Sequence, residues 1–228
     1  AENDWPLPMP VFDPAVLPRT VDKLQSAGSL TVVLLGDSIS TGCNASGWAN
    51  GAPFQPPYPQ LLRQQLQAHY GAEVNLVNLS VGGKSTPWGE TMTAEVAKQM
   101  PDLVILAFGM NDSARISAEQ YGANTAKMIA SIRQQHAAAE FVLVASMLGN
   151  RDWTLLKHEV FPKYRDQLKQ LCQNGIALAD MTSVWEEFFK RKQDADLTGN
   201  GVNHPNDFGH RVYDQVIESL LLDPAKSK

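Results

Sequence analysis

Four residues that could take part in acyl transfer stand far apart in the sequence, each in or beside a glycine-containing segment: Ser38, Gly83, Asn111 and His204. A serine hydroxyl can act as a nucleophile and a histidine as its general base. A glycine N–H group and an asparagine side-chain amide can stabilise the oxyanion that forms on the attacked carbonyl. Each residue alone is equally explained by a turn, a helix cap or a solvated loop. The chemistry therefore depends on whether the fold brings the four together.

The elements that must position these residues alternate between strand-like and helix-like segments. Short apolar runs predict five strands at residues 30–35, 74–79, 102–108, 141–147 and 176–179. Apolar periodicity, capping residues and Gly or Pro stops predict helices near 58–70, 91–100, 155–172, 184–192 and 207–222, and one that begins after Ser117. Such alternation predicts a five-stranded parallel sheet in one three-layer α/β/α sandwich over residues 30–228. The proline-rich residues 1–29 are predicted to be an extended N-terminal arm.

The candidate residues all fall at one edge of this predicted sheet. Ligands of a parallel sheet bind beyond the carboxyl ends of its strands. Ser38, Gly83 and Asn111 follow the first, second and third strands, and His204 lies just before the final helix. Their convergence would supply a nucleophile, two kinds of oxyanion donor and a base. Asp37 and Asp112, beside two of them, are expected to be hydrogen-bonding supports.

Four ordered segments of the chain resemble the conserved blocks of the SGNH, or GDSL-type, hydrolase superfamily: Gly36-Asp37-Ser38, Gly83, Gly109-Met110-Asn111-Asp112 and His204-Pro205. The resemblance runs from about residue 30 to the final helix. It implies a flavodoxin-like α/β/α sandwich and esterase or lipase activity without a metal or other cofactor. It also implies that Ser38 is the nucleophile, Gly83 and Asn111 are oxyanion donors, and His204 is the general base.

The chain departs from the family pattern before the histidine. The family usually has an aspartate three residues ahead of it, where this chain has Gly201, with Asn200 one position further back. Some members use a Ser-His dyad whose imidazole is oriented by a backbone carbonyl, and we expect such a dyad here. Asp194 and Asp196 remain alternative acids if their loop folds back.

Composition limits the classes of partner. Hydrophobic residues make up 43% of the 228 residues, which excludes a disordered chain, and no apolar run approaches the ~20 residues of a membrane span. The net charge of −5 and the absence of a basic cluster argue against a nucleic-acid partner. Cys43 and Cys172 could form one bridge at most, and His204, Asp207 and His210 lack the further ligands of a closed metal site. The oligomeric state stays open.

Three tryptophans fall in predicted loops near the same sheet edge: Trp48, Trp88 and Trp153. Aromatic rings stack on sugars as well as fill cores. We therefore predict a serine esterase that removes small acyl groups, above all acetyl, from a carbohydrate. The alternatives are a lysophospholipase or thioesterase of the same superfamily, and a catalytically silent carbohydrate-binding protein. The proline-rich start at Ala1 indicates a processed chain, so we expect a secreted or periplasmic protein.

Overall fold

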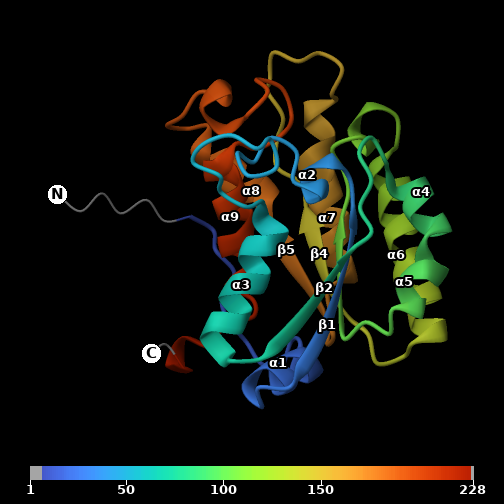
Figure 1. Cartoon of the computed structure of the whole chain (residues 1–228). Helices are drawn as coiled ribbons and strands as arrows, with labels where there is room; N and C mark the ends of the chain where they lie inside the picture. Colours follow the sequence, from blue (N-terminus) through green and yellow to red (C-terminus); the bar gives the residue numbers. More distant parts are fainter. Residues whose placement is uncertain (1–6, 227–228) are drawn as a thin grey trace.

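Five parallel strands form the middle layer of the fold. The computed structural model describes residues 7–226. The strands lie in the order β2-β1-β3-β4-β5, which confirms the predicted α/β sandwich (Figure 1). Their bounds are β1 Ser29–Gly36, β2 Glu73–Asn78, β3 Leu103–Ala107, β4 Glu140–Ala145 and β5 Ile176–Asp180. Each predicted strand is present, with its ends within two residues of the expected positions.

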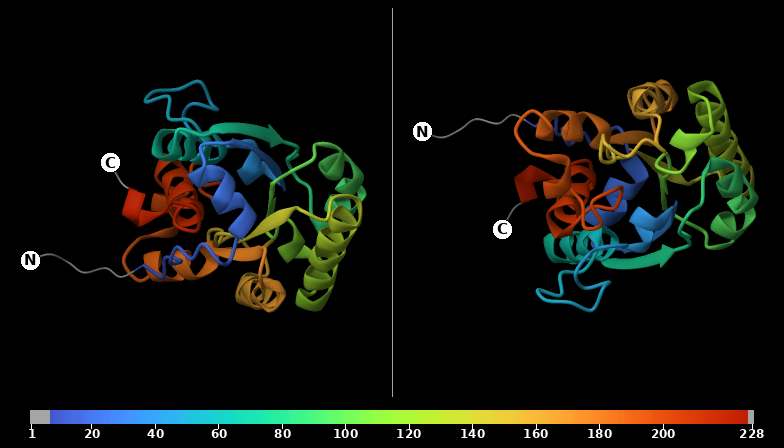
Figure 2. Two further views of the ribbon diagram at one scale, coloured as in Figure 1. Left: turned by 90° about the horizontal axis from the view of Figure 1, so that it is seen from below. Right: turned by 90° about the horizontal axis from the view of Figure 1, so that it is seen from above.

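Helices cover both faces of the sheet (Figures 1 and 2). One face carries α1 Pro18–Gln25, α3 Tyr58–Tyr70, α8 Met181–Phe188 and α9 Asp207–Glu218, and the other carries α4 Thr86–Thr91, α5 Thr93–Lys98, α6 Ala118–Gln135 and α7 Phe161–Leu171. Short turns of helix lie in the connections, α2 Ser38–Thr41, η1 Asp112–Ala114, η2 His158–Val160 and η3 Asp194–Leu197, and a further one, η4 Pro224–Lys226, follows α9. Among residues 7–226, no helix combines the length and the hydropathy needed to cross a membrane.

Strands β1, β3 and β4 are buried on both faces, which gives the molecule two hydrophobic cores. Successive side chains of a strand point to opposite faces. Leu34 and Ile105 therefore pack under α1, α3, α8 and α9, while Val33 and Leu106 pack under α5, α6 and α7. The long apolar runs that predicted these strands reflect this two-sided burial.

The prediction of an extended arm over residues 1–29 is wrong for residues 18–25. They form α1, because Pro18 occupies the first turn, where its missing N–H costs nothing, and because Leu17, Val21 and Leu24 recur on one face. The Glu140 carboxylate, at the start of β4, accepts the backbone N–H groups of residues 19 and 20. Residues 1–6 of the predicted arm lie outside the described residues.

Two predicted helices differ from the observed ones at their ends. The helix predicted for residues 91–100 is α5, which begins only at Thr93, because α4 ends at Thr91 and Met92 separates the two helices. The helix expected from residue 155 begins only at Phe161, where Pro162 occupies a first-turn position. Residues 146–157 are thereby left as a loop at the edge of the sheet where β4 ends.

Candidate active site

A tight turn at the end of β1 holds the candidate nucleophile. A Cβ atom on Gly36 would stand 2.5 Å from the carbonyl oxygen of Ala107, so only glycine allows β1 and β3 to approach this closely. Asp37 then caps α2, and its Oδ1 accepts the backbone N–H of Ile39 at 2.9 Å. Ser38 is thus fixed as the first residue of α2, at the carboxyl end of the central strand.

His204 reaches this serine from the other end of the chain. It lies two residues before Asn206, whose side chain caps α9 by accepting the N–H of Gly209. The carbonyl oxygen of His204 accepts the N–H of Gly199 at 2.9 Å, which closes the loop. Ser38 Oγ and His204 Nε2 are 2.7 Å apart. Burial lowers the pKa of His204, so the imidazole is neutral and able to accept a proton near pH 7.

The other ring nitrogen of His204 faces two amides. His204 Nδ1 lies 3.0 Å from Asn44 Oδ1 and 3.1 Å from Asn200 Nδ2. The two acids considered from the sequence bond elsewhere: Asp194 forms an ion pair with Arg151 at 2.7 Å, and Asp196 accepts the N–H of Gln193 at 3.0 Å. Neither Asp194 nor Asp196 therefore replaces the aspartate that the family usually has before its histidine.

The loops after β2 and β3 meet beside Ser38. A Cβ atom on Gly82 would lie 3.7 Å from Ser38 Cβ. Gly83 follows with a left-handed φ of 75°, and a Cβ built there would meet nothing within 4 Å. Asn111 Nδ2 donates to the carbonyl oxygen of Lys84 at 2.9 Å, which joins the Asn111 side chain to the glycine loop. Ser38, the glycine pair, Asn111 and His204 thus lie at one end of the sheet.

Asp112 joins the same two loops through hydrogen bonds. Its carboxylate accepts the N–H of Thr86 at 2.9 Å and that of Gly109 at 3.2 Å, and it also accepts the hydroxyl of Thr86. The side chain is fully buried, and this burial raises its pKa. Asp112 is therefore a hydrogen-bonding support, as the sequence indicated.

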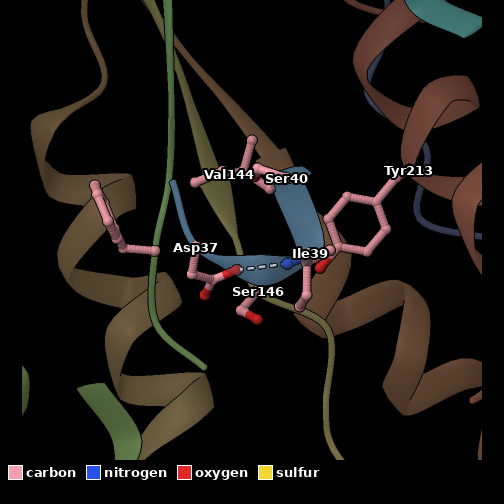
Figure 3. A pocket seen from close by; sticks show the side chains of 8 residues that line it. Asp37, Ile39, Ser40, Val144, Ser146 and Tyr213 are labelled. Carbon is pink, nitrogen blue, oxygen red and sulfur yellow. Dashed lines mark hydrogen bonds between the residues drawn. The ribbon is translucent and has the colours of Figure 1, made fainter. Parts of the chain in front are cut away.

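Asp37 supports the turn at Ser38 through a hydrogen bond of the same kind. Its side chain lies beside a small internal cavity of about 10 Å³, the size of one water molecule, which Ser146 and Tyr213 also line (Figure 3). Burial raises the pKa of Asp37 to about 7. Asp37 is only 2% exposed, so its carboxyl group acts on the turn through hydrogen bonds and is shielded from solvent.

A groove of about 360 Å³ opens directly beside Asn111. Its walls combine apolar, amide and cationic side chains: Met110, Asn111, Ala114, Arg115, Trp153, Leu155, Leu156 and Asn203. Trp153 is thus the tryptophan that faces this groove. Trp88 packs against the core under α5, α6 and α7, with its ring centre 6.3 Å from that of Phe108. Trp48 lies on the loop after α2 and is 54% exposed.

Asn44 is the residue at the site that the sequence did not single out. It adopts a left-handed φ of 69°, a conformation that asparagine tolerates better than most residues, and this preference was the available signal. The contact with His204 joins positions 160 residues apart, which no local pattern reveals. Cys43, just before it, and Cys172 are separate free thiols.

Comparison with solved structures finds the same fold in several esterases. A two-domain esterase active on acetylated mannans aligns with a TM-score of 0.73 and 19% identity, over 95% of this chain and 54% of that one. This chain thus spans about half of that protein. A mutant acetyl-xylooligosaccharide esterase from Geobacillus stearothermophilus gives a TM-score of 0.71 at 19% identity over 89% and 99% of the two chains. A putative GDSL-like lipase from Parabacteroides merdae gives 0.70 at 16% identity, over 85% and 96%.

The family assignment comes from the sequence itself. No curated protein matches the chain. The model of the GDSL-like lipase/acylhydrolase family matches residues 34–212, well over half of the chain. That segment contains the turn at Ser38, the loops of Gly83 and Asn111, and His204. The chain therefore belongs to the GDSL-like lipase/acylhydrolase family and is a carboxylic ester hydrolase.

Proposed function

We propose that the protein is a serine esterase that removes small acyl groups, chiefly acetyl, from a carbohydrate. The observation that carries this proposal is the 2.7 Å contact between Ser38 Oγ and His204 Nε2 at the sheet edge. A hydroxyl held this close to a neutral imidazole is an activated nucleophile. The groove beside Asn111 leaves room for an ester group next to it.

In the first half of the reaction, His204 Nε2 takes the proton of Ser38 Oγ while Oγ bonds to the ester carbonyl carbon. Negative charge develops on the carbonyl oxygen. The backbone N–H groups of Ser38 and Gly83 and the side-chain amide of Asn111 are the donors that we assign to this oxyanion. When the intermediate collapses, the bond to the sugar oxygen breaks, and His204 returns the proton to the departing alcohol.

The second half releases the acyl group. A water molecule gives a proton to His204 Nε2 as its oxygen attacks the carbonyl carbon of the acyl-enzyme. The bond to Ser38 Oγ then breaks, and the serine oxygen recovers the proton from the imidazole. The acyl group leaves as acetic acid, which ionises to acetate in solution. The free enzyme has regained its starting protonation state.

Two observations support a carbohydrate as the alcohol part of the substrate. Trp153 lines the groove next to Asn111, where an indole ring could stack on a sugar. Two of the structures with this fold are described as active on acetylated mannans and as an acetyl-xylooligosaccharide esterase. We also propose a secreted or periplasmic location, which suits a polysaccharide substrate.

One observation favours a second candidate, a lysophospholipase or thioesterase. Leu155, on the same groove, is 68% exposed, and an acyl chain of medium length could cover it. The two proposals differ in the acyl length that the enzyme prefers. A fast acetate ester supports the first, and an optimum at a medium or long acyl chain supports the second.

The test combines a chain-length series of p-nitrophenyl esters with phosphonate labelling of the serine. We expect the wild type to be fastest on the acetate ester and to be labelled at Ser38, while Ser38→Ala loses turnover and labelling but keeps its unfolding transition. Trp153→Ala should lower kcat/KM on an acetylated glycan more than on p-nitrophenyl acetate, with Trp88→Ala as the matched tryptophan variant. A wild type that is neither active nor labelled would favour the silent carbohydrate-binding alternative.

A further inference from the structure

The Nδ1 atom of His204 lies between two asparagine side chains with opposite hydrogen-bonding roles. Asn44 presents its carbonyl oxygen to Nδ1 at 3.0 Å, and Asn200 presents its amide nitrogen at 3.1 Å. A neutral imidazole carries one proton, so one ring nitrogen donates while the other accepts. The two asparagines therefore stabilise different tautomers of the same ring.

Asn200 cannot take the role of the missing aspartate. Its Oδ1 accepts three backbone N–H groups, from Val202 and Asn203 at 3.0 Å and from His204 at 3.2 Å. These three bonds fix the orientation of the amide, so Nδ2 is the group that points at His204. As a donor it stabilises the tautomer with a bare Nδ1 and a protonated Nε2. That tautomer cannot accept the proton of Ser38.

Asn44 has the opposite effect. General-base action requires a lone pair on Nε2, and the ring proton must then sit on Nδ1. Asn44 Oδ1 is the acceptor that the described residues provide for that proton at hydrogen-bond distance. The contact between Nε2 and Ser38 Oγ is productive in this tautomer alone.

The surrounding loop keeps Asn44 in position independently of His204. Two residues further on, the N–H of Ser46 donates to Asp207 Oδ1 at 2.7 Å, which ties the loop to the first turn of α9. A Cβ atom on Gly199 would lie 2.6 Å from Asn44 Cβ, so the loop before His204 passes close to Asn44 only because it has glycine there. Asn44, with its left-handed backbone, therefore lies between the tie of Ser46 to α9 and the close contact with the loop at Gly199.

We propose that Asn44 is the third member of a Ser-His-Asn triad, a positioning residue that selects the active tautomer of His204 in place of the usual aspartate. This inference rests on the proposed function, because it assigns His204 as the base. It replaces the expected dyad with a side-chain acceptor from the loop after α2. A neutral amide orients the ring without adding a charge that would stabilise the imidazolium.

The groups around the imidazole define what a pH measurement will report. Ser38 faces it from α2, Asn44 and Asn200 face it from their loops, and His210 lies close by on α9. His210 is fully buried, and its own pKa is lowered to about 4. Asp207, on the same helix, accepts the N–H of Ser46, and its charge acts to raise the pKa of His210 against the larger effect of burial. Burial is accordingly the cause that lowers the pKa of His204.

The test substitutes Asn44 in two ways and follows the His204 ring by ¹⁵N-resolved NMR. Asn44→Gly keeps the left-handed backbone and removes the acceptor, so we expect more of the Nε2-protonated tautomer. Asn44→Asp replaces the amide by a carboxylate, and we expect the midpoint of the His204 titration to rise by about one pH unit or more. Asn50, an exposed residue of the same loop with φ of 54°, supplies the matched controls Asn50→Gly and Asn50→Asp, which should change neither property.

Kinetics on p-nitrophenyl acetate then measure the consequence for catalysis. We expect kcat to fall at least about tenfold in Asn44→Gly with little change in KM, and the acid limb of the kcat profile to move to higher pH in Asn44→Asp. An unchanged tautomer ratio and an unchanged kcat in Asn44→Gly would overturn the triad, as would an unchanged titration in Asn44→Asp. The NMR readout needs no substrate, so it distinguishes this failure from a failure of the esterase proposal, which would show as an inactive, unlabelled wild type.

Discussion

The side-chain amide of Asn111 carries two N–H groups, and one of them donates to the carbonyl oxygen of Lys84 at 2.9 Å. That bond fixes the plane of the amide before any substrate binds. Because this bond fixes the amide plane, the direction of the second N–H group is fixed as well. That group can donate to an oxyanion without reorganisation of the side chain.

We expect Asn111→Ala to lower kcat by about 10²- to 10³-fold with a much smaller change in KM, because the donor is needed where charge develops in the transition state. Asn111→Asp should be at least as slow, since a carboxylate would oppose the oxyanion. The measurement is steady-state kinetics on p-nitrophenyl acetate, with urea unfolding to show that both variants are folded. Wild-type kcat in Asn111→Ala would remove this residue from the oxyanion site.

At the scale of elements, the sites of chemistry follow from where parallel strands end. The buried apolar runs of β1 and β3 were sufficient to predict that Ser38 and Asn111 lie at one edge of the sheet, because that conclusion needs only strand direction. His204 could be added because it precedes the last helix. The contact between Asn44 and His204 could not be predicted, since it depends on the path of two irregular loops and on the close approach that Gly199 allows.

The helix α1 was missed for a related reason. Prolines before Leu17 indicated an extended segment, and the short apolar period at Leu17, Val21 and Leu24 gains its stability from the sheet that it covers. The acceptor for its first turn, Glu140, lies 120 residues away along the chain from Thr20. Local patterns therefore predict the sheet well, and they predict poorly those elements whose partners are distant in sequence.

Asp112 joins two elements, and its removal should affect both stability and rate. In Asp112→Ala, the buried N–H groups of Thr86 and Gly109 lose their acceptor. We expect the free energy of unfolding to fall by about 2 kcal/mol or more, because each unsatisfied buried donor costs about 1–3 kcal/mol. We also expect kcat to fall, because the loops that carry Gly83 and Asn111 are no longer held in register.

Urea unfolding and acetate-ester kinetics on the same preparations test the coupling. Asp112→Asn is the matched variant of the same size: its Oδ1 can still accept from Thr86, while its amide nitrogen opposes the N–H of Gly109, so both losses should be intermediate. A destabilised Asp112→Ala with unaltered kcat would mean that the loops keep their relative position without this carboxylate.

At the scale of the whole molecule, buried titratable groups make stability depend on pH with opposite signs. His210 has its pKa lowered to about 4, so the unfolded chain binds a proton more readily, and stability is lost as pH falls from the ordinary histidine value of about 6.5. Asp214, on the same helix α9, behaves in the opposite way. Burial, followed by the nearby charge of Glu218, raises its pKa to about 8.

Asp214 should therefore cost stability at neutral pH, and Asp214→Asn should recover it. The side chain is 5% exposed, and its Oδ1 has no hydrogen-bond partner among residues 7–226. Between about pH 4 and pH 8 the folded state keeps a proton on Asp214 that the unfolded state has lost, so stability due to this group falls as pH rises. The amide does not titrate, and the stability of the variant should exceed that of the wild type increasingly over this interval.

The test compares free energies of unfolding by urea at pH 4 and pH 7. We expect the difference between Asp214→Asn and the wild type to grow by at least about 1 kcal/mol between these two values, because one unit of altered pKa corresponds to about 1.4 kcal/mol. His210 is common to both proteins, so its opposite contribution cancels in the difference. Asp22→Asn, which removes the same charge from an exposed site of α1, is the matched control. A constant difference for Asp214→Asn would mean that this carboxyl group titrates alike in the folded and unfolded chains, and that helix α9 tolerates its ionised form.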